Sequence, residues 1–127
     1  MISEIAREAL NTSVVPILVG DGLKARLLAA KVFMKYGVHS VICDEKQSAW
    51  RFVVGFGGFY KIIRTHDPRL LCEELERISE LSAGGVLIIA PCSNIFSDLV
   101  SECEREIEKR FVIAKPNTLL DKIYPDN

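Results

Sequence analysis

Apolar residues occur in short unbroken runs that alternate along the chain with segments of helical spacing. Unbroken apolar runs are typical of strands buried on both faces of a sheet. Four such runs lie at residues 14–19, 38–43, 86–90 and 111–114. Apolar residues at helical spacing predict helices at residues 1–10, 23–36, 68–83 and 96–107. This alternation predicts a parallel sheet with helices on both faces.

The segment 50–63 has a different pattern, because β-branched and aromatic residues lie on both sides of Gly55-Phe56-Gly57-Gly58. This arrangement favours two strands joined by a turn, and a single irregular strand is the alternative. With one strand counted here, we expect a three-layer α/β/α Rossmann-like fold. Its sheet would be mostly parallel, with about five strands in the order 3-2-1-4-5. The chain would then reverse direction between the strands at 14–19 and 86–90, where ligands bind in open α/β sheets.

The chain has 127 residues, a length at which single domains are common. No linker, repeat or low-complexity tract divides it. We therefore expect one domain over 1–127, with an N-terminal helix at 1–12, a Rossmann-like core at 14–115 and a C-terminal extension at 116–127. A two-domain dehydrogenase or a kinase would not fit in this length.

Charge is balanced overall and uneven along the chain. The net charge of −1 argues against a nucleic-acid-binding module, which usually has a basic excess. Residues 1–64 carry +4 and residues 65–127 carry −5. Two Glu-rich stretches, Glu73–Glu80 and Glu102–Glu108, account for most of the acidic excess and are predicted to be solvated helix faces. In the helix at 23–36, one face carries Lys24, Lys31 and Lys35, and another carries Leu23, Leu27, Ala30 and Met34.

The four cysteines do not form a Cys-x-x-Cys motif, so neither a zinc site nor a thioredoxin-type site is expected. Cys43, Cys72 and Cys103 are predicted to be small residues that face the core. We expect reduced thiols in a cytoplasmic protein. A secretory signal pattern is not evident, and no apolar run approaches the roughly 18 residues of a membrane span. Association with a membrane is therefore not expected.

Cys92 lies at the end of a predicted central strand, just before a helix. A helix N-terminus can lower the pKa of a thiol and make it a nucleophile. A catalytic cysteine also needs a base. His39 lies within a strand and His66 lies just before a helix cap, so neither is an evident partner. A thiol without a catalytic role is the favoured interpretation.

The segment Gly20-Asp21-Gly22-Leu23-Lys24-Ala25 fits the pattern G-x-G-x-x-A between a strand and a helix, and Asp44 follows Gly22 by 22 residues. In a dinucleotide site the glycines admit a pyrophosphate and the acidic residue binds a ribose hydroxyl. The charge of Asp21 beside a phosphate and the lack of a second half-domain count against such a site. The alternative is a tight turn between strand and helix.

A second turn, at residues 91–94, is predicted at the same edge of the sheet. Backbone N–H groups in the two turns could bind a carboxylate or a phosphate. The candidate ligand-binding residues are Gly20, Asp21, Gly22, Asp44, Pro91, Cys92, Ser93 and Asn94.

The segment 50–63 carries five of the ten aromatic residues of the chain. It is either part of the core and the sheet edge or an exposed apolar surface for a partner, such as a second copy in a homodimer. The candidate interface residues are Trp50, Phe52, Phe56, Phe59 and Tyr60.

Several segments, in order, resemble a known domain family. They are Pro-Ile-Leu-Val-Gly-Asp at 16–21, Phe-Met-Lys-Tyr-Gly-Val at 33–38, His-Ser-Val-Ile at 39–42, Val-Leu-Ile-Ile-Ala-Pro at 86–91, Glu-Lys-Arg-Phe-Val-Ile-Ala-Lys-Pro at 108–116 and Leu-Leu-Asp-Lys at 119–122. Together they are similar to the pre-ATP-grasp domain at the N-terminus of carbamoyl-phosphate-synthase-like and D-aspartate-ligase-like carboxylate–amine ligases. The resemblance implies a Rossmann-like fold that helps to form the substrate cleft. It also implies that ATP and magnesium are bound by two further domains, which this sequence does not include.

These observations lead to one principal hypothesis and two alternatives. The principal hypothesis is a stand-alone or truncated pre-ATP-grasp domain with no cofactor and no catalytic activity of its own. It would supply a substrate-side or interaction surface to an ATP-grasp catalytic domain or partner chain. The first alternative is an independent module that binds NAD or another nucleotide through Gly20, Gly22, Ala25 and Asp44. The second is a non-catalytic, homo-oligomeric interaction protein.

Overall fold

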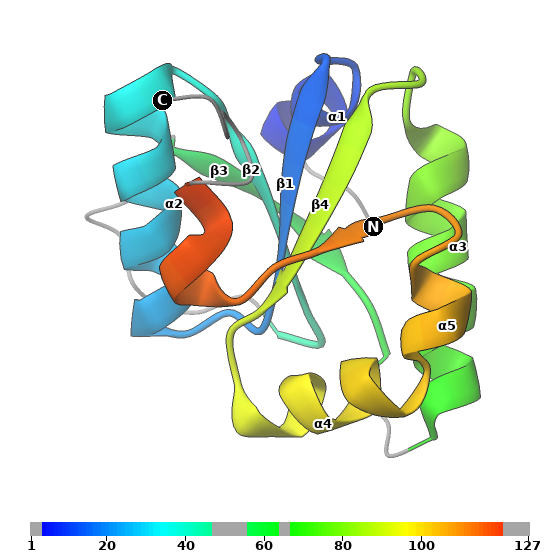
Figure 1. Cartoon of the computed structure of the whole chain (residues 1–127). Coiled ribbons are helices and arrows are strands. Elements are labelled where there is room, and N and C mark those ends of the chain that lie inside the picture. Colours follow the sequence, from blue (N-terminus) through cyan, green and yellow to red (C-terminus); the bar gives the residue numbers. More distant parts are fainter. Residues whose placement is uncertain (1–3, 47–55, 64–66, 121–127) are drawn as a thin grey trace.

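The computed structural model describes residues 4–46, 56–63 and 67–120, and these contain a five-stranded sheet. The strands are β1 (Val14–Val19), β2 (Ser40–Asp44), β3 (Gly57–Lys61), β4 (Val86–Pro91) and β5 (Val112–Ile113). Their order is β3-β2-β1-β4-β5, and each neighbouring pair is parallel. The predicted order is therefore confirmed, and the sheet is parallel throughout (Figure 1).

Helices cover both faces of this sheet, as Figure 1 shows. They are α1 (Glu4–Leu10), α2 (Leu23–Tyr36), α3 (Pro68–Leu81), α4 (Asn94–Glu102), α5 (Glu104–Ile107) and a 3-10 turn at Pro116–Thr118. One core lies between the sheet and α2, and the other lies between the sheet and α1, α3, α4 and α5. The three-layer Rossmann-like prediction is confirmed. Among the described helices, none has the length and apolar character needed to cross a bilayer.

The position of the central strand β1 between two helical layers explains why its sequence is apolar without interruption. Val15, Ile17 and Val19 point into the core beneath α1 and α3, and Leu18 points into the core beneath α2. Alternate side chains of a strand point to opposite faces, so a strand covered on both sides needs apolar residues at every position.

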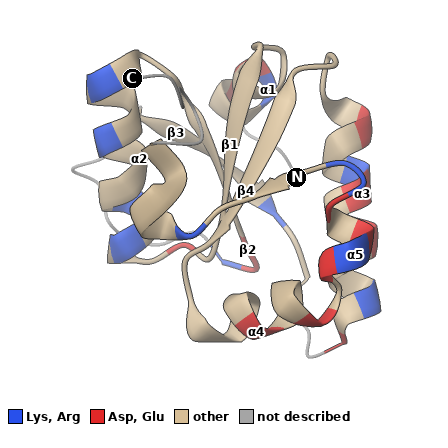
Figure 2. Ribbon diagram, in the orientation of Figure 1, with Lys and Arg blue, Asp and Glu red and all other residues tan. Residues whose placement is uncertain are grey.

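The exposed surface is divided by charge. Lys24, Lys31 and Lys35 are exposed on α2, and glutamates are concentrated on α3, α4 and α5 (Figure 2). Most of these glutamates are exposed, as predicted for acidic helix faces. Glu74 is the exception, because it is buried, and its Oε1 accepts a hydrogen bond from the Nη1 of Arg77 at 2.7 Å.

The predicted apolar face of α2 does not face the core. Leu23 and Leu27 are exposed, and Met34 is 78% exposed. The buried residues of this helix are Ala25, Arg26, Leu28, Ala29 and Val32. Apolar residues lie on two faces of α2, so spacing alone did not identify the buried one.

The helix predicted at 96–107 is broken at Cys103. This residue ends α4 and precedes α5, with φ −119° and ψ 27°, which is outside the α-helical region. Phe96, Leu99, Val100 and Ile107 are nevertheless buried in one core, as their spacing predicts. The apolar face is therefore kept across the break.

Gly57 and Gly58 lie inside β3 rather than in the predicted turn. A Cβ on Gly58 would overlap the backbone of Ile5 and Ala6, so the glycine allows α1 to lie directly against β3. Residues 50–55 are outside the described part of the chain, so the choice between a hairpin and a single strand stays a prediction.

We expect Gly58→Ala to destabilise the protein by about 1–3 kcal/mol, because the added methyl group must displace the backbone of α1. Urea unfolding measures the change. Gly22→Ser is the matched control, since nothing lies within 4 Å of a Cβ at Gly22 and serine is a favoured N-cap residue. Equal midpoints for Gly58→Ala and the unmodified protein would contradict the close packing of α1 on β3.

Candidate functional site

The turn between β1 and α2 is built around a buried ion pair. Arg26 donates from Nε to Oδ1 of Asp21 at 2.6 Å and from Nη2 to Oδ2 at 2.9 Å. The side chains of Arg26 and Asp21 are 4% and 0% exposed. Buried charges persist only when they are paired and hydrogen-bonded, and a two-point guanidinium–carboxylate contact provides both. The charge of Asp21 is therefore compensated inside the protein.

Asp44, at the end of β2, joins this turn through its carboxylate. Its Oδ2 accepts a hydrogen bond from the backbone N–H of Asp21 at 2.9 Å, and its Oδ1 accepts one from the N–H of Glu45 at 2.7 Å. Asp44 is only 4% exposed. The carboxylate thus links the end of β2 to the turn that follows β1.

These contacts change the interpretation of the Gly-x-Gly segment. A dinucleotide site needs its acidic residue to accept ribose hydroxyls, but both carboxylate oxygens of Asp44 accept backbone N–H groups and the side chain is buried. The geometry therefore favours the alternative of a tight turn, with Asp21 and Asp44 in structural roles.

Gly20 is the glycine that this turn requires. Its φ of +114° is rarely adopted by other residues, and its N–H donates to the carbonyl of Cys43 at 2.7 Å. A Cβ there would lie 3.5 Å from backbone and side-chain atoms of Cys92 and Ser93. Gly20 thus lies against the second predicted turn. Gly22, the N-cap of α2, has open space around it.

The second turn is held at the same edge of the sheet. The N–H of Cys92 donates to the carbonyl of Val19 at 2.8 Å. Ser93 is the N-cap of α4, and its Oγ accepts a hydrogen bond from the N–H of Phe96 at 3.3 Å. The structure therefore brings the turns at 20–22 and 91–94 together, as the topology predicts.

A cavity of about 430 Å³ lies on the β4 side of this edge, and we call it the carboxyl-edge crevice. It is lined by Lys24, Pro91, Cys92, Ser93, Asn94, Ser97, Lys115, Pro116 and Asn117. Pro91, Cys92, Ser93 and Asn94 were predicted as candidates and line it. Gly20, Asp21, Gly22 and Asp44 are not among its lining residues.

Sequence reasoning missed Lys24 and Lys115 as site residues. Both are exposed, and both line the crevice. Lys24 lies in the first turn of α2, and Lys115 follows the last strand, so each comes directly after a carboxyl end of the sheet. Their positions after strand ends were the sequence signal that could have identified them as site residues. The crevice has two cationic side chains and the polar side chains of Ser93, Asn94, Ser97 and Asn117.

Cys92 lies in the crevice as a protonated thiol. Burial raises its pKa to about 11, which outweighs the lowering effect of Lys24. Its Sγ donates to the carbonyl of Ala90 at 3.5 Å. His39 precedes β2, whereas Cys92 follows β4, so the two lie at opposite ends of the parallel sheet. His66 is outside the described residues.

The predicted aromatic interface is only partly described. Trp50 and Phe52 lie outside the described residues. Phe56, Phe59 and Tyr60 are half-buried, and the ring of Phe56 lies 5.2 Å from that of Phe33 on α2. Within residues 4–46, 56–63 and 67–120, no group of three or more His, Cys, Asp or Glu side chains is arranged to hold a metal ion.

Comparison with known proteins found no matching family model, no similar curated protein and no similar solved structure.

Replacing Arg26 should be costly, because it removes the buried guanidinium that pairs with the buried carboxylate of Asp21. We expect Arg26→Met to lower the free energy of unfolding by about 3–5 kcal/mol in denaturant titrations. Lys109→Met is the control: Lys109 pairs with Glu106, and both side chains are exposed, so its loss should cost less than about 1 kcal/mol. Similar losses for the two variants would contradict the structural role of the buried pair.

The raised pKa of Cys92 predicts a slow reaction with iodoacetamide. With a pKa of about 11, about one thiol in a thousand is ionised near pH 8, and the thiolate is the reactive form. The labelling rate at Cys92, followed by peptide mass, should rise about tenfold per pH unit from about pH 7 to about pH 10. A plateau below about pH 9 would instead indicate an activated thiol.

Proposed function

We propose that this chain is a non-catalytic, pre-ATP-grasp-type domain that binds the anionic part of a substrate in its carboxyl-edge crevice. The observation that carries the proposal is the position of Lys24 and Lys115 around a cavity at the carboxyl ends of β1, β4 and β5. Ligands bind in open α/β sheets at this reversal of strand order.

The size and chemistry of the crevice suit a small carboxylate or phosphate. A volume of about 430 Å³ falls in the range of small-molecule sites. Lys24 and Lys115 provide positive charge, and Ser93, Asn94 and Asn117 can form hydrogen bonds. The start of α2 adds backbone N–H groups that have no side-chain cap, and such groups favour anions.

The groups that line the crevice are suited to binding rather than to catalysis. Cys92 is held as a thiol, and the remaining lining residues are lysines, amides, hydroxyls and prolines. In this proposal, ATP and magnesium are bound by ATP-grasp domains, on a partner chain or on a further part of the same protein. The resemblance of the apolar strands and turns to the pre-ATP-grasp domain supports this division.

An exposed apolar surface on α2 supports contact with such a partner. Leu23, Leu27 and Met34 are exposed on the helix whose first turn provides Lys24 to the crevice. A catalytic domain that packed on α2 would therefore adjoin the bound ligand. A homodimer through the aromatic segment is the alternative partner arrangement, and Phe56 and Phe59 on the β3 edge would contribute to it.

Titration calorimetry with L-aspartate, inorganic phosphate and ATP tests the proposal. We expect saturable binding of a carboxylate or phosphate that weakens with added salt, because the site is cationic. Lys24→Ala and Lys115→Ala should each weaken binding about tenfold, since each removes one charge-assisted contact.

Lys35→Ala is the matched control, because Lys35 is an exposed lysine in the last turn of the same helix. It should leave the affinity unchanged. Equal weakening by Lys35→Ala, or binding of NAD that is insensitive to Lys24 and Lys115, would contradict the proposed site.

A further inference from the structure

Two cysteines lie near each other on the acidic side of the domain, away from the carboxyl-edge crevice. Cys72 lies on α3, and Cys103 lies at the break between α4 and α5. Both are half-buried against the same core, and both line one cavity of about 700 Å³. Burial, together with the neighbouring Cys72 thiol, raises the pKa of Cys103 to about 12.

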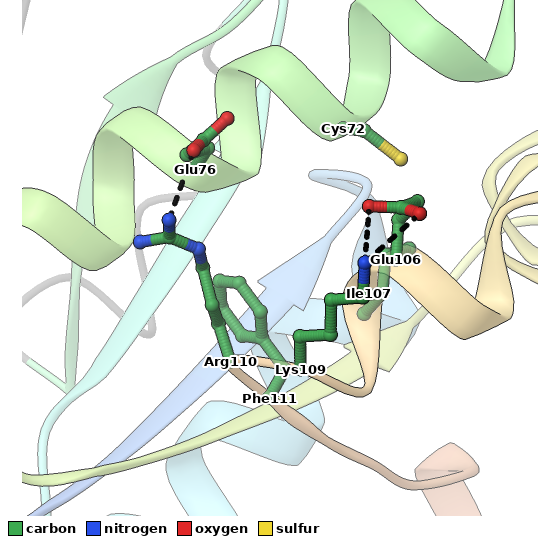
Figure 3. Close-up of a pocket in the computed structure, with 7 residues that line it drawn as sticks. All are labelled: Cys72, Glu76, Glu106, Ile107, Lys109, Arg110 and Phe111. Carbon is green, nitrogen blue, oxygen red and sulfur yellow. Dashed lines mark hydrogen bonds and ion pairs between the residues drawn. The ribbon is translucent and has the colours of Figure 1, made fainter.

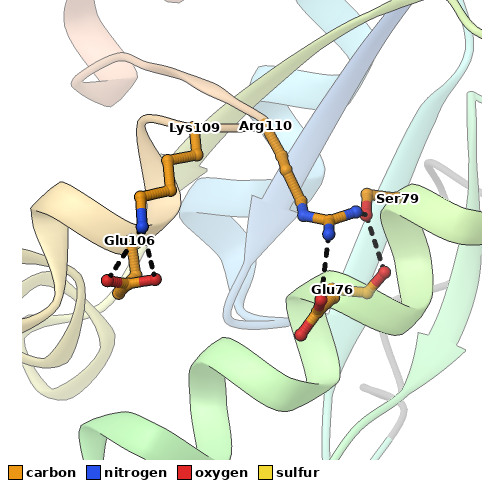
Figure 4. A network of polar contacts seen from close by, with 5 residues as sticks. All are labelled: Glu76, Ser79, Glu106, Lys109 and Arg110. Atoms are coloured by element: carbon orange, nitrogen blue, oxygen red, sulfur yellow. Dashed lines mark hydrogen bonds and ion pairs between the residues drawn. The ribbon is translucent and has the colours of Figure 1, made fainter.

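Polar contacts hold the two helical segments in this position. Arg110, just after α5, donates from Nη2 to Oε1 of Glu76 at 2.9 Å and from Nη1 to Oγ of Ser79 at 3.2 Å (Figure 4). Both acceptors lie on α3. Lys109, also just after α5, pairs with Glu106 on α5 at 3.2 Å. The contacts of Arg110 therefore tie the end of α5 to α3, which keeps Cys103 close to Cys72.

Cys72 can be reached from two sides. Besides the cavity that it shares with Cys103, it lines a second cavity of about 230 Å³ between α3 and residues 106–111. Figure 3 shows its sulfur directed from α3 toward the α5 side of that cavity. Cys103 lines only the first of these two cavities, and its thiol also donates to the carbonyl of Leu99 at 3.1 Å. Cys72 is thus the better placed thiol for a first reaction.

We propose that Cys72 and Cys103 are a thiol–disulfide modification site that accepts oxidising equivalents from a small-molecule disulfide. The Cys72 thiol loses its proton, and the thiolate attacks one sulfur of the reagent. A mixed disulfide forms, and one reduced thiol leaves. Cys103 then loses its proton, attacks the Cys72 sulfur and releases the second thiol. The two protein thiols lose two electrons and two protons, and the reagent disulfide becomes two thiols.

The charge around the cavity selects among disulfides. Its lining includes four glutamates and two arginines, namely Glu73, Glu102, Glu104, Glu106, Arg69 and Arg105. This acidic excess attracts a cationic disulfide and repels an anionic one. Cystamine, a dication, should therefore oxidise the pair faster than oxidised glutathione at low salt.

A disulfide between Cys72 and Cys103 would close a loop that contains β4 and the turn at 91–94. Closing a loop removes conformational freedom from the unfolded chain. The oxidised protein should therefore melt at a higher temperature than the reduced protein.

The experiment incubates the folded protein with cystamine, blocks the remaining thiols and maps the linked peptides by mass. We expect one intramolecular Cys72–Cys103 link, a melting temperature raised by several degrees, and full reversal by a reducing agent.

Cys103→Ser should stop the reaction at a cysteamine adduct on Cys72. Cys72→Ser should slow modification of Cys103 at least about tenfold, because Cys72 reacts first. Cys92→Ser is the control, and it should form the link at the unmodified rate.

Three results would overturn the proposal. The first is a folded protein that gives cysteamine adducts and no link. The second is a link that is lost in Cys92→Ser. The third is an unchanged rate of Cys103 modification in Cys72→Ser. A faster reaction with oxidised glutathione than with cystamine at low salt would overturn the proposed charge selectivity.

Discussion

The buried contact of Arg26 with Asp21 is the interaction on which the carboxyl edge of the sheet depends. Removing two charges from water is costly, and the pair is stable only because two hydrogen bonds join it. Asp44 extends the pair to β2 by accepting the N–H of Asp21. The end of β2 is thereby fixed to the turn after β1 and to the first turn of α2. Lys24 owes its position beside the crevice to this arrangement.

The β2 side and the β4 side of the carboxyl edge look alike in the sequence but have different roles. On the β2 side, Gly20, Asp21 and Asp44 take part in a hydrogen-bonded network within the fold. On the β4 side, the crevice presents Lys24 and Lys115 to solvent. A Gly-x-Gly turn followed by an acidic residue can thus connect a strand to a helix without forming a nucleotide site. We therefore propose that anions are recognised on the β4 side. Cys72 and Cys103 lie on another part of the surface, so their proposed oxidation can be tested independently of ligand binding.

Much of the fold was predictable because strands buried on two faces need apolar residues at every position, as β1 and β4 have. The features that were not predictable depend on tertiary contacts. Gly57 and Gly58, which could have belonged to a turn, lie in β3, because Gly58 accommodates α1, and nothing local encodes that approach. The apolar face of α2 was ambiguous because Leu27 and Leu28 are adjacent and only tertiary packing buries the second. The role of Asp21 was missed because its partner, Arg26, lies five residues away across a helix start. The edge that holds the crevice was predictable from strand order. The two lysines follow strand ends, but exposed lysines are common on any surface, so this signal did not single them out.

The central claim is that ligand recognition takes place on the β4 side of the carboxyl edge, while the acidic network on the β2 side serves the fold. Amide chemical shifts of isotope-labelled protein, titrated with inorganic phosphate and with L-aspartate, test it most directly. The account predicts saturable shifts at Lys24, Asn94 and Asn117, with the amides of Asp21 and Glu45 unchanged because Asp44 holds them. Shifts centred on Asp21 and Glu45, with none at Asn94 or Asn117, would contradict it.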